Sequence, residues 1–412
     1  MKKFAPYFHL ATCIVAFTLP VYPRALPVLI ALAALLWIVS ISARETWNNL
    51  KNNKYYFFIC SGLFWVYLLS MSYSANQQEG WMKIETSLSL LLFPLFLFST
   101  FKPGEANSTE KIVRWFVYGC IASTITCFVY SLFCYLFPDI AVSNKWSDYD
   151  YKLYFFWKDR LSPFIHTTYI SMYLNTAIAF LLFSSSSLPF RKRSSLLLIS
   201  LFSVTVLLLS SRAGLITLGI LWICIIYKTI IAEKQYASGL AILLFIAAVF
   251  TGLYFRSDEF NLRISSMFSA FSSPAVENPA IEKSLIRFKI WPVALETGLN
   301  NLPFGAGIGD ASDALQAAYT EKSMVSEMGK FLNAHNQFIQ TLVATGIPGL
   351  LSLLLLLLFP AYLSIKNNNQ AYAAFLLIII INFLFESMLQ TQAGVVFFSF
   401  LNTVLFCSFL KK

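Results

Sequence analysis

Apolar runs of about 20 residues recur along the whole chain, and each is long enough to cross a bilayer as a helix. The runs lack the alternation of polar and apolar residues that strands of a membrane barrel show. Only 12% of the residues are charged, whereas a soluble domain carries about 25%. The sequence therefore predicts an all-α integral membrane protein.

Twelve apolar ranges are candidate membrane spans. The first resembles a signal peptide, but Pro20 and Pro23 stand where a small-residue cleavage site would be, so we expect it to be retained. The twelve predicted ranges are 7–23, 25–43, 55–73, 86–101, 113–137, 166–186, 195–210, 213–231, 238–255, 337–364, 371–387 and 391–410.

Basic residues gather in alternate connections between these ranges. The connections on one side contain 16 Lys and Arg residues, whereas the opposite side has 7 outside its one long loop. The positive-inside rule makes the first side cytoplasmic, so both termini are expected there. The net charge of +10 is thereby assigned to cytoplasmic loops, and no nucleic-acid partner is expected. The seven cysteines lie almost entirely in apolar runs without a CxxC pair, which indicates packing residues.

Two segments on the outer side are too long to be turns. Residues 138–165 are rich in Trp and Tyr, which suits either an interfacial aromatic belt or a platform for sugars. Residues 256–334 hold 7 basic and 9 acidic residues, and apolar spacing predicts a helix over 287–299. We expect a turn over 303–310 and a second short helix over 311–322. We therefore expect spans 1–9 in residues 1–255, a mainly helical periplasmic loop domain in 256–335, and spans 10–12 in 336–412.

Arg212 lies between two long apolar runs, in Leu207–Leu215. A charge at the centre of a span costs roughly 2.5–3.5 kcal/mol on insertion scales, and less near the edge. A chain keeps such a charge where it binds something, and the planar fork of an Arg side chain suits phosphate. Arg212 is therefore a candidate ligand for an anionic, lipid-linked substrate.

The chain has three histidines, and two of them open predicted spans at the outer side. His166 begins the sixth predicted span and His335 begins the tenth, whereas His9 lies near the inner face and is expected to be structural. A histidine can take a proton from a hydroxyl near neutral pH. Arg and His together at one membrane face suit transfer from a phosphate-bearing donor to a hydroxyl.

The chain has no DxD, HExxH or GxxxxGK[ST] motif, so neither a metal-bound nucleotide sugar nor ATP is supported as a donor. We expect neither a metal site nor a cofactor, because Arg residues can neutralise a pyrophosphate leaving group. The glycines at 305, 307 and 309 follow no predicted strand, so they indicate a backbone turn and not a dinucleotide site.

Several short segments lie in a fixed order around the large outer loop. They are Ser211–Gly214, Arg287 with Trp291, Pro303–Asp310, His335–Ile339 and Gly346–Leu350, together with Pro163–Tyr169 and Glu386–Gly394. In these segments the sequence resembles the O-antigen ligase / O-antigen polymerase family of polytopic glycosyltransferases. The layout agrees over nearly the whole chain, and the order of the motifs is the most specific part.

This resemblance implies a helical membrane bundle with a periplasmic loop domain. It also implies transfer of a glycan from undecaprenyl pyrophosphate to an acceptor hydroxyl, with inversion and without a metal. By the resemblance, Arg212 and Arg287 serve the pyrophosphate and His335 is the general base. Arg263 is a further candidate phosphate contact, and His166 and Asn336 are candidate substrate-binding residues.

The expected protein is an O-antigen ligase of lipopolysaccharide biosynthesis in the bacterial inner membrane, with lipid A–core as acceptor and a periplasmic active site. A polymerase that extends the carrier-linked glycan is the alternative within the family, because the motifs are shared. A transporter of lipid-linked glycans is a third hypothesis. It is disfavoured because the two halves of the chain do not match and few charges lie within spans.

Overall fold

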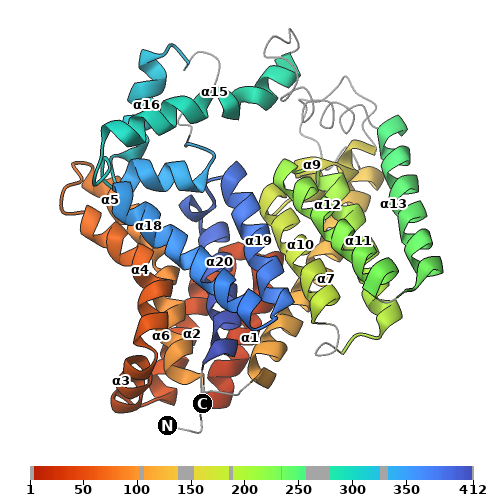
Figure 1. Ribbon diagram of the computed structural model, residues 1–412, viewed down its shortest axis with the longest axis horizontal. Coiled ribbons are helices and arrows are strands. Elements are labelled where there is room, and N and C mark those ends of the chain that lie inside the picture. Colours follow the sequence, from red (N-terminus) through yellow and green to blue (C-terminus); the bar gives the residue numbers. More distant parts are fainter. Residues whose placement is uncertain are drawn as a thin grey trace. The chain divides into compact units, whose positions relative to one another are not determined.

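The computed structural model describes residues 4–101, 106–137, 153–184, 189–232, 234–256, 279–324 and 333–410. Within these ranges the regular structure is helical, and no strand occurs (Figure 1). Seven of the described helices are long and apolar enough to cross a membrane, and three shorter helices are also apolar. The prediction of an all-helical membrane protein is confirmed, and the number of spans stays a prediction.

The chain divides into two compact units, residues 1–116 with 287–412 and residues 117–286. Two long helices, α7 and α15, cross the boundary between them. The helices of the first unit are α1 (Ala5–Val21), η2 (Pro23–Ala25), α2 (Leu26–Ser40), α3 (Ala43–Asn52), α4 (Lys54–Ser70), α5 (Gln77–Ser87), α6 (Ser89–Thr100), the start of α7 (Ala106–Leu136), most of α15 (Pro279–Asn300), α16 (Ala311–Glu321), α18 (Gln337–Lys366), α19 (Gln370–Phe385), η5 (Met388–Gln390), α20 (Gln392–Phe406) and η6 (Cys407–Phe409).

The core of the first unit is built on α20, which is apolar on every side. All residues from Gly394 to Phe406 are buried, as expected of a helix with no polar face. Aromatic rings pack edge to face around it, with Phe400 against Phe93 at 5.0 Å and Phe398 against Phe383 at 5.4 Å between ring centroids. Helix α20 packs against α6, and α18 packs against both α4 and α19.

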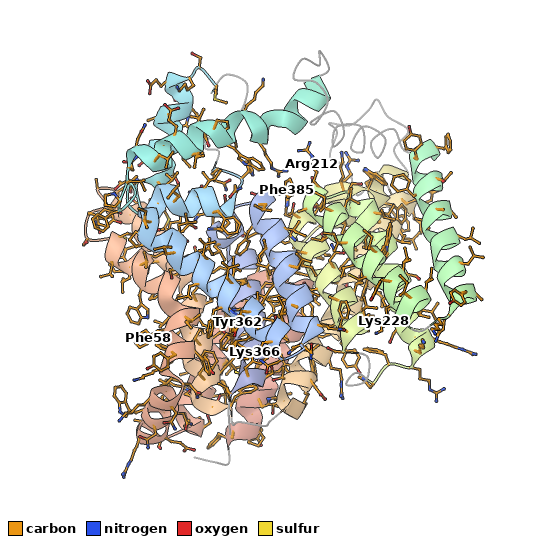
Figure 2. All side chains as sticks on the ribbon, viewed as in Figure 1. Phe58, Arg212, Lys228, Tyr362, Lys366 and Phe385 are labelled. Atoms are coloured by element: carbon orange, nitrogen blue, oxygen red, sulfur yellow. The ribbon has the colours of Figure 1, made fainter. Side chains whose placement is uncertain are left out.

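Helices α18 and α19 run in opposite directions, so the start of α18 and the end of α19 meet at one end of the unit. Figure 2 shows Phe385, the last residue of α19, far from Lys366, the last residue of α18. The residues just before α18 and just after α19 are therefore neighbours, although about 50 positions separate them in the sequence.

The second unit contains the rest of α7, η3 (Leu153–Phe156), α9 (Lys158–Leu161), α10 (Thr167–Phe183), α11 (Lys192–Leu209), α12 (Arg212–Ile226), the π-helical segment η4 (Tyr227–Ala232) and α13 (Tyr236–Arg256). Helix α10 is central, since residues 167–182 are all buried and it packs against α11 and α12. Its Asn175 side chain donates a hydrogen bond to the Gly214 carbonyl at 2.9 Å, which stabilises the α10–α12 contact.

Each of the twelve predicted ranges contains a helix. The helix predicted over 287–299 is confirmed and extends over Pro279–Asn300, and the one predicted over 311–322 is confirmed as Ala311–Glu321. Much of the aromatic outer segment (138–152) and the candidate phosphate contact Arg263 lie outside the described residues. The domain limits at 255 and 335 stay predictions.

Candidate active site

Three side chains of the first unit form a hydrogen-bonded cluster, the His335–Glu386–Arg287 cluster. His335 Nδ1 lies 2.8 Å from one carboxylate oxygen of Glu386, and a terminal guanidinium nitrogen of Arg287 donates to the other at 3.3 Å. The three side chains are 24%, 14% and 21% exposed, respectively, so the cluster is shielded but reachable from solvent. The structure thus brings together two of the residues predicted from the sequence.

Asn336 fixes the entry to α18 beside His335. Its side-chain oxygen accepts hydrogen bonds from the Phe338 and Ile339 N–H groups at 2.9 and 3.1 Å, an N-cap that satisfies two free donors. Its amide nitrogen donates to the Leu384 carbonyl at 3.2 Å, which ties the start of α18 to the end of α19. This buried side chain therefore positions the cluster, and the substrate-binding role of Asn336 stays a prediction.

His335 itself has an unusual backbone conformation. Its φ of 44° is in the left-handed region, which a non-glycine residue adopts only at some cost. Hydrogen bonds hold it there: its N–H donates to the Asn333 side chain at 2.9 Å, and the Ala334 N–H donates to the Gln340 side chain at 3.0 Å. Strain of this kind is often found where a side chain must be aimed.

On the other side of the cluster, Gln337 fixes the segment that follows Glu386. Its side-chain oxygen accepts from the Leu389 N–H at 2.7 Å, and its amide nitrogen donates to the Thr341 hydroxyl at 3.0 Å. Gln337 is fully buried. Buried polar groups with satisfied hydrogen bonds hold their surroundings in one arrangement, so both chain segments that carry the cluster are fixed.

Both carboxylate oxygens of Glu386 have partners. The Arg287 guanidinium donates to one of them at 3.3 Å, and the Ser387 N–H donates to the other at 3.3 Å. A neighbouring positive charge and a backbone donor both favour the ionised form of a carboxyl. Glu386 is therefore assigned as a carboxylate.

Sequence reasoning did not single out Glu386 as a site residue. It was noted only within the segment Glu386–Gly394 of the family resemblance. The sequence feature that could have indicated it is a single carboxylate directly after an apolar helix, because Glu386 follows the last residue of α19. Another carboxylate of α15, Glu296, pairs with Lys322 at 3.4 Å.

The glycine-rich turn after α15 is a structural lock within the first unit. The Ala306 and Gly307 N–H groups donate to the Val343 and Ala344 carbonyls at 2.8 and 3.0 Å, and the Ile347 N–H donates to the Pro303 carbonyl at 2.9 Å. The turn therefore lies against α18 where that helix is kinked. The prediction of a backbone turn over 303–310 is confirmed.

Gly346 forms the kink in α18. Its φ of 60° and ψ of −148° interrupt the helix, and a Cβ there would collide with the Pro303 carbonyl. Only glycine combines this conformation with so close a backbone contact. The segments Gly346–Leu350 and Pro303–Asp310 are therefore in contact in the fold, although about 40 residues separate them in the sequence.

Asp310 attaches the same turn to the loop before α5. Its two carboxylate oxygens accept from the successive N–H groups of Ala75 and Asn76, each at 2.7 Å. Asn76 is the N-cap of α5, so the negative charge also lies near the positive end of that helix. The Gly309 N–H donates to the Ser74 hydroxyl at 3.1 Å, which completes the attachment.

Gly309→Ala should destabilise the first unit, because a Cβ there would collide with the Asn76 carbonyl, a backbone atom that cannot turn away. We expect a loss of about 1–3 kcal/mol, the usual cost of overpacking, visible as a lower thermal transition of the purified protein in detergent. Gly219→Ala is the matched control, since a Cβ at Gly219 in α12 meets no atom within 4 Å. Equal transition temperatures for Gly309→Ala and the parent protein would contradict this account.

Arg212 is the first residue of α12, in the second unit. Ser210, with a φ of 49°, ends α11, and Ser211 caps α12 by accepting from the Gly214 N–H at 3.5 Å. A Cβ at Gly214 would lie 2.7 Å from the Ser171 Cβ on α10, so the small residue allows close helix packing. The motif Ser211–Gly214 therefore builds a tight turn that presents an arginine at its end.

His166 caps α10 in the same unit. Its Nδ1 accepts a hydrogen bond from the Thr168 N–H at 3.4 Å, and its ring is exposed. Because α10 and α12 run in the same direction, His166 and Arg212 lie at the same end of this unit. Figure 2 shows Arg212 at that end and Lys228 near the other, where Lys228 donates to the Leu182 carbonyl at 2.6 Å.

The described residues contain no group of three or more His, Cys, Asp or Glu side chains placed to hold a metal ion. All seven cysteines are free thiols, as expected from their positions in apolar runs. His9 is close to Cys13 on the same helix, with 4.0 Å between its Nε2 and the sulfur, which suits the structural role expected of it.

Residues 196–354 match the family model described as O-Antigen ligase. The matched range begins in α11, ends within α18, and includes Arg212, Arg287 and His335. It also includes the glycine-rich turn and the kink in α18. A comparison with curated proteins finds no match. The resemblance drawn from the motifs is thus confirmed.

Proposed function

Since this membrane protein carries an O-antigen ligase family domain over residues 196–354, we propose that it transfers a glycan from undecaprenyl pyrophosphate to a hydroxyl group of lipid A–core. The proposal includes a periplasmic site in the bacterial inner membrane, twelve spans and two cytoplasmic termini. Lys228 and Lys366, both assigned to the cytoplasmic side by the charge pattern, lie at the ends of their units opposite Arg212 and Phe385 (Figure 2). That placement agrees with the proposed orientation.

One observation carries the proposal. The single domain match includes the residue best suited to accept a proton, His335, together with two arginines suited to a pyrophosphate, Arg212 and Arg287. His335 and Arg287 are joined through Glu386 in one partly exposed cluster. A base beside an anion-binding group is what transfer from a phosphorylated donor to a hydroxyl requires.

The proposed reaction is a single displacement. The acceptor oxygen attacks the anomeric carbon, the bond from that carbon to the pyrophosphate oxygen breaks, and undecaprenyl pyrophosphate leaves with the electron pair. His335 takes the proton of the acceptor hydroxyl, and the anomeric configuration is inverted. Arg212 and Arg287 stabilise the negative charge that develops on the leaving group, so the proposed reaction needs neither a metal nor a cofactor.

The surroundings of Arg212 favour an anionic ligand. Arg212 is the first residue of α12, and the helix dipole adds partial positive charge at that end. A guanidinium placed beside the partial positive charge of a helix N-terminus is suited to a site that binds an anion. We therefore assign Arg212 to the pyrophosphate, with His166 as a substrate-binding residue at the same end of the unit.

His335 is a better base than His166. The His166 Nδ1 accepts the capping hydrogen bond from Thr168, so the neutral ring carries its proton on Nε2 and is a donor there. The His335 Nδ1 faces an ionised carboxylate, which can only accept. The proton of the neutral His335 ring is then on Nδ1, and Nε2 has a free lone pair. This difference assigns proton transfer to His335.

The acceptor distinguishes a ligase from a polymerase of the same family. A bacterial strain that lacks this protein should lose long glycan on the lipid A–core and retain glycan polymer on its carrier, which can be followed by gel analysis of extracted lipopolysaccharide. A strain that retains only single repeat units would instead make the protein a polymerase. Unchanged surface glycan would contradict both assignments.

A further inference from the structure

Glu386 is the only acidic residue between Glu327 and the C-terminus in the sequence, and it lies at the centre of the cluster. Each carboxylate oxygen has a different partner, with Oε1 facing His335 at 2.8 Å and Oε2 facing Arg287 at 3.3 Å. The same Oε1 also accepts from the Ser387 N–H at 3.3 Å, which holds the carboxylate against its own backbone. The carboxylate is thus fixed between the two residues.

We propose that Glu386 is a positioning residue that aligns the base and the anion-binding arginine with one side chain. Through Oε1 it holds the His335 proton on Nδ1 and turns Nε2, with its lone pair, toward the acceptor. Through Oε2 it holds the Arg287 guanidinium by a single nitrogen, so the other N–H groups of this side chain face the leaving group. This inference rests on the proposed function and assigns to Glu386 no contact with substrate.

The contact to Arg287 is the weaker of the two. A single N–H···O contact at 3.3 Å uses only a small part of the five donors of a guanidinium. A pyrophosphate can therefore bind Arg287 without first breaking the contact between His335 and Glu386. The base keeps its orientation while the donor binds, which a bidentate Arg287–Glu386 pair would not allow as readily.

Glu386→Gln is the informative substitution because an amide cannot serve both partners. If the amide oxygen accepts from His335 Nδ1, the NH₂ group faces the Arg287 donors and releases that side chain. If the oxygen faces Arg287, the NH₂ group donates to Nδ1 and moves the ring proton to Nε2, which removes the base. Glu386→Asp keeps two charged acceptors and shortens the side chain, and the long Arg287 can follow it.

The first measurement is steady-state transfer by full-length protein from a carrier-linked glycan to lipid A–core. We expect Glu386→Gln to lower kcat by about 10²–10⁴-fold, the range for losing an oriented general base, and Glu386→Asp to restore most of that loss. Glu296→Gln is the matched control, since it removes a carboxylate on α15 whose exposed pair with Lys322 is worth little. Glu386→Gln with the kcat of the parent enzyme would overturn the proposal.

The second measurement reads the ring directly, without turnover. In ¹⁵N-histidine-labelled protein, the signal that disappears in His335→Gln belongs to His335, and the chain has only two other histidines. We expect this signal to report a proton on Nδ1 and to change in Glu386→Gln, but not in Glu296→Gln. A His335 signal with the proton on Nε2 in the parent protein overturns the proposal.

The two measurements separate the possible failures. A His335 signal that responds to Glu386→Gln in a protein without any glycan transfer supports the alignment by Glu386 and overturns the proposed function. Normal transfer by both the parent and Glu386→Gln supports the proposed function and overturns the role of Glu386. Both variants are compared at equal amounts of membrane-inserted protein, so a folding defect does not imitate either result.

Discussion

Replacing His335 by alanine should lower the rate of glycan transfer by about 10²–10⁴-fold, the usual contribution of a general base. Binding of the lipid-linked donor should persist, because the pyrophosphate is assigned to Arg212 and Arg287, whereas His335 contacts Glu386. The measurement is single-turnover transfer by purified His335→Ala protein, together with a separate assay of donor binding. A loss of kcat without a matching rise in the donor Kd identifies a group that acts on the chemical step.

His166→Ala is the comparison that makes this test decisive. The Nδ1 of His166 is used in capping α10, so removing the ring should weaken donor binding or the helix end, with a smaller effect on the chemical step. His335→Ala with the turnover of the parent enzyme, beside an inactive His166→Ala, would move the role of base to His166.

Arg212→Lys should lower transfer by about 10²–10³-fold, the cost of losing one preorganised donor to a developing negative charge. The substitution keeps the positive charge but loses the planar fork that binds two phosphate oxygens at once. Because the residue begins α12 and does not interrupt it, membrane insertion should be unchanged. The measurement is transfer per amount of inserted protein.

Arg24→Lys is the matched control, since Arg24 is an exposed residue in the short helix η2. It should have the activity of the parent protein. Near-normal transfer by a well-expressed Arg212→Ala protein would remove Arg212 from the pyrophosphate site.

The sequence contains enough information to predict the helices of this fold. The apolar runs predicted twelve ranges that each contain a helix, and apolar spacing predicted most of α15 within the long loop. The second short helix predicted there is α16. Boundaries were less predictable. The predicted range 86–101 is preceded by α5, which begins at Gln77 and is capped by Asn76. The residues of α5 are largely polar, so a search for apolar runs does not detect this helix.

Partners far apart in the sequence were not predictable in the same way. The glycines and Asp310 were identified as a turn, but the groups that hold it are about 235 residues away. They are the Ser74 hydroxyl and the backbone N–H groups of Ala75 and Asn76. Asn336 was predicted to bind substrate, and the sequence did not indicate that its side chain also caps α18. A single sequence does not reveal which end of which helix a polar side chain meets.

Glu386 illustrates the same limit at the site itself. His335 and Arg287 were identified by their chemistry and by the order of motifs, but neither suggests a carboxylate 51 residues beyond the histidine. The packing of α18 against α19 brings Glu386 to His335, and α15 brings Arg287 to the same carboxylate. The residue that joins the base to the arginine is therefore a product of the fold.

The most direct test of the proposed function is transfer by the purified protein, supplied with a glycan on undecaprenyl pyrophosphate and with lipid A–core, in excess EDTA. We expect a glycan joined to lipid A–core with inverted anomeric configuration, and release of undecaprenyl pyrophosphate in equal amount. Loss of activity in EDTA that magnesium or manganese restores would contradict the metal-free mechanism. A product in which the glycan has grown on its carrier, with lipid A–core unmodified, would contradict the ligase assignment.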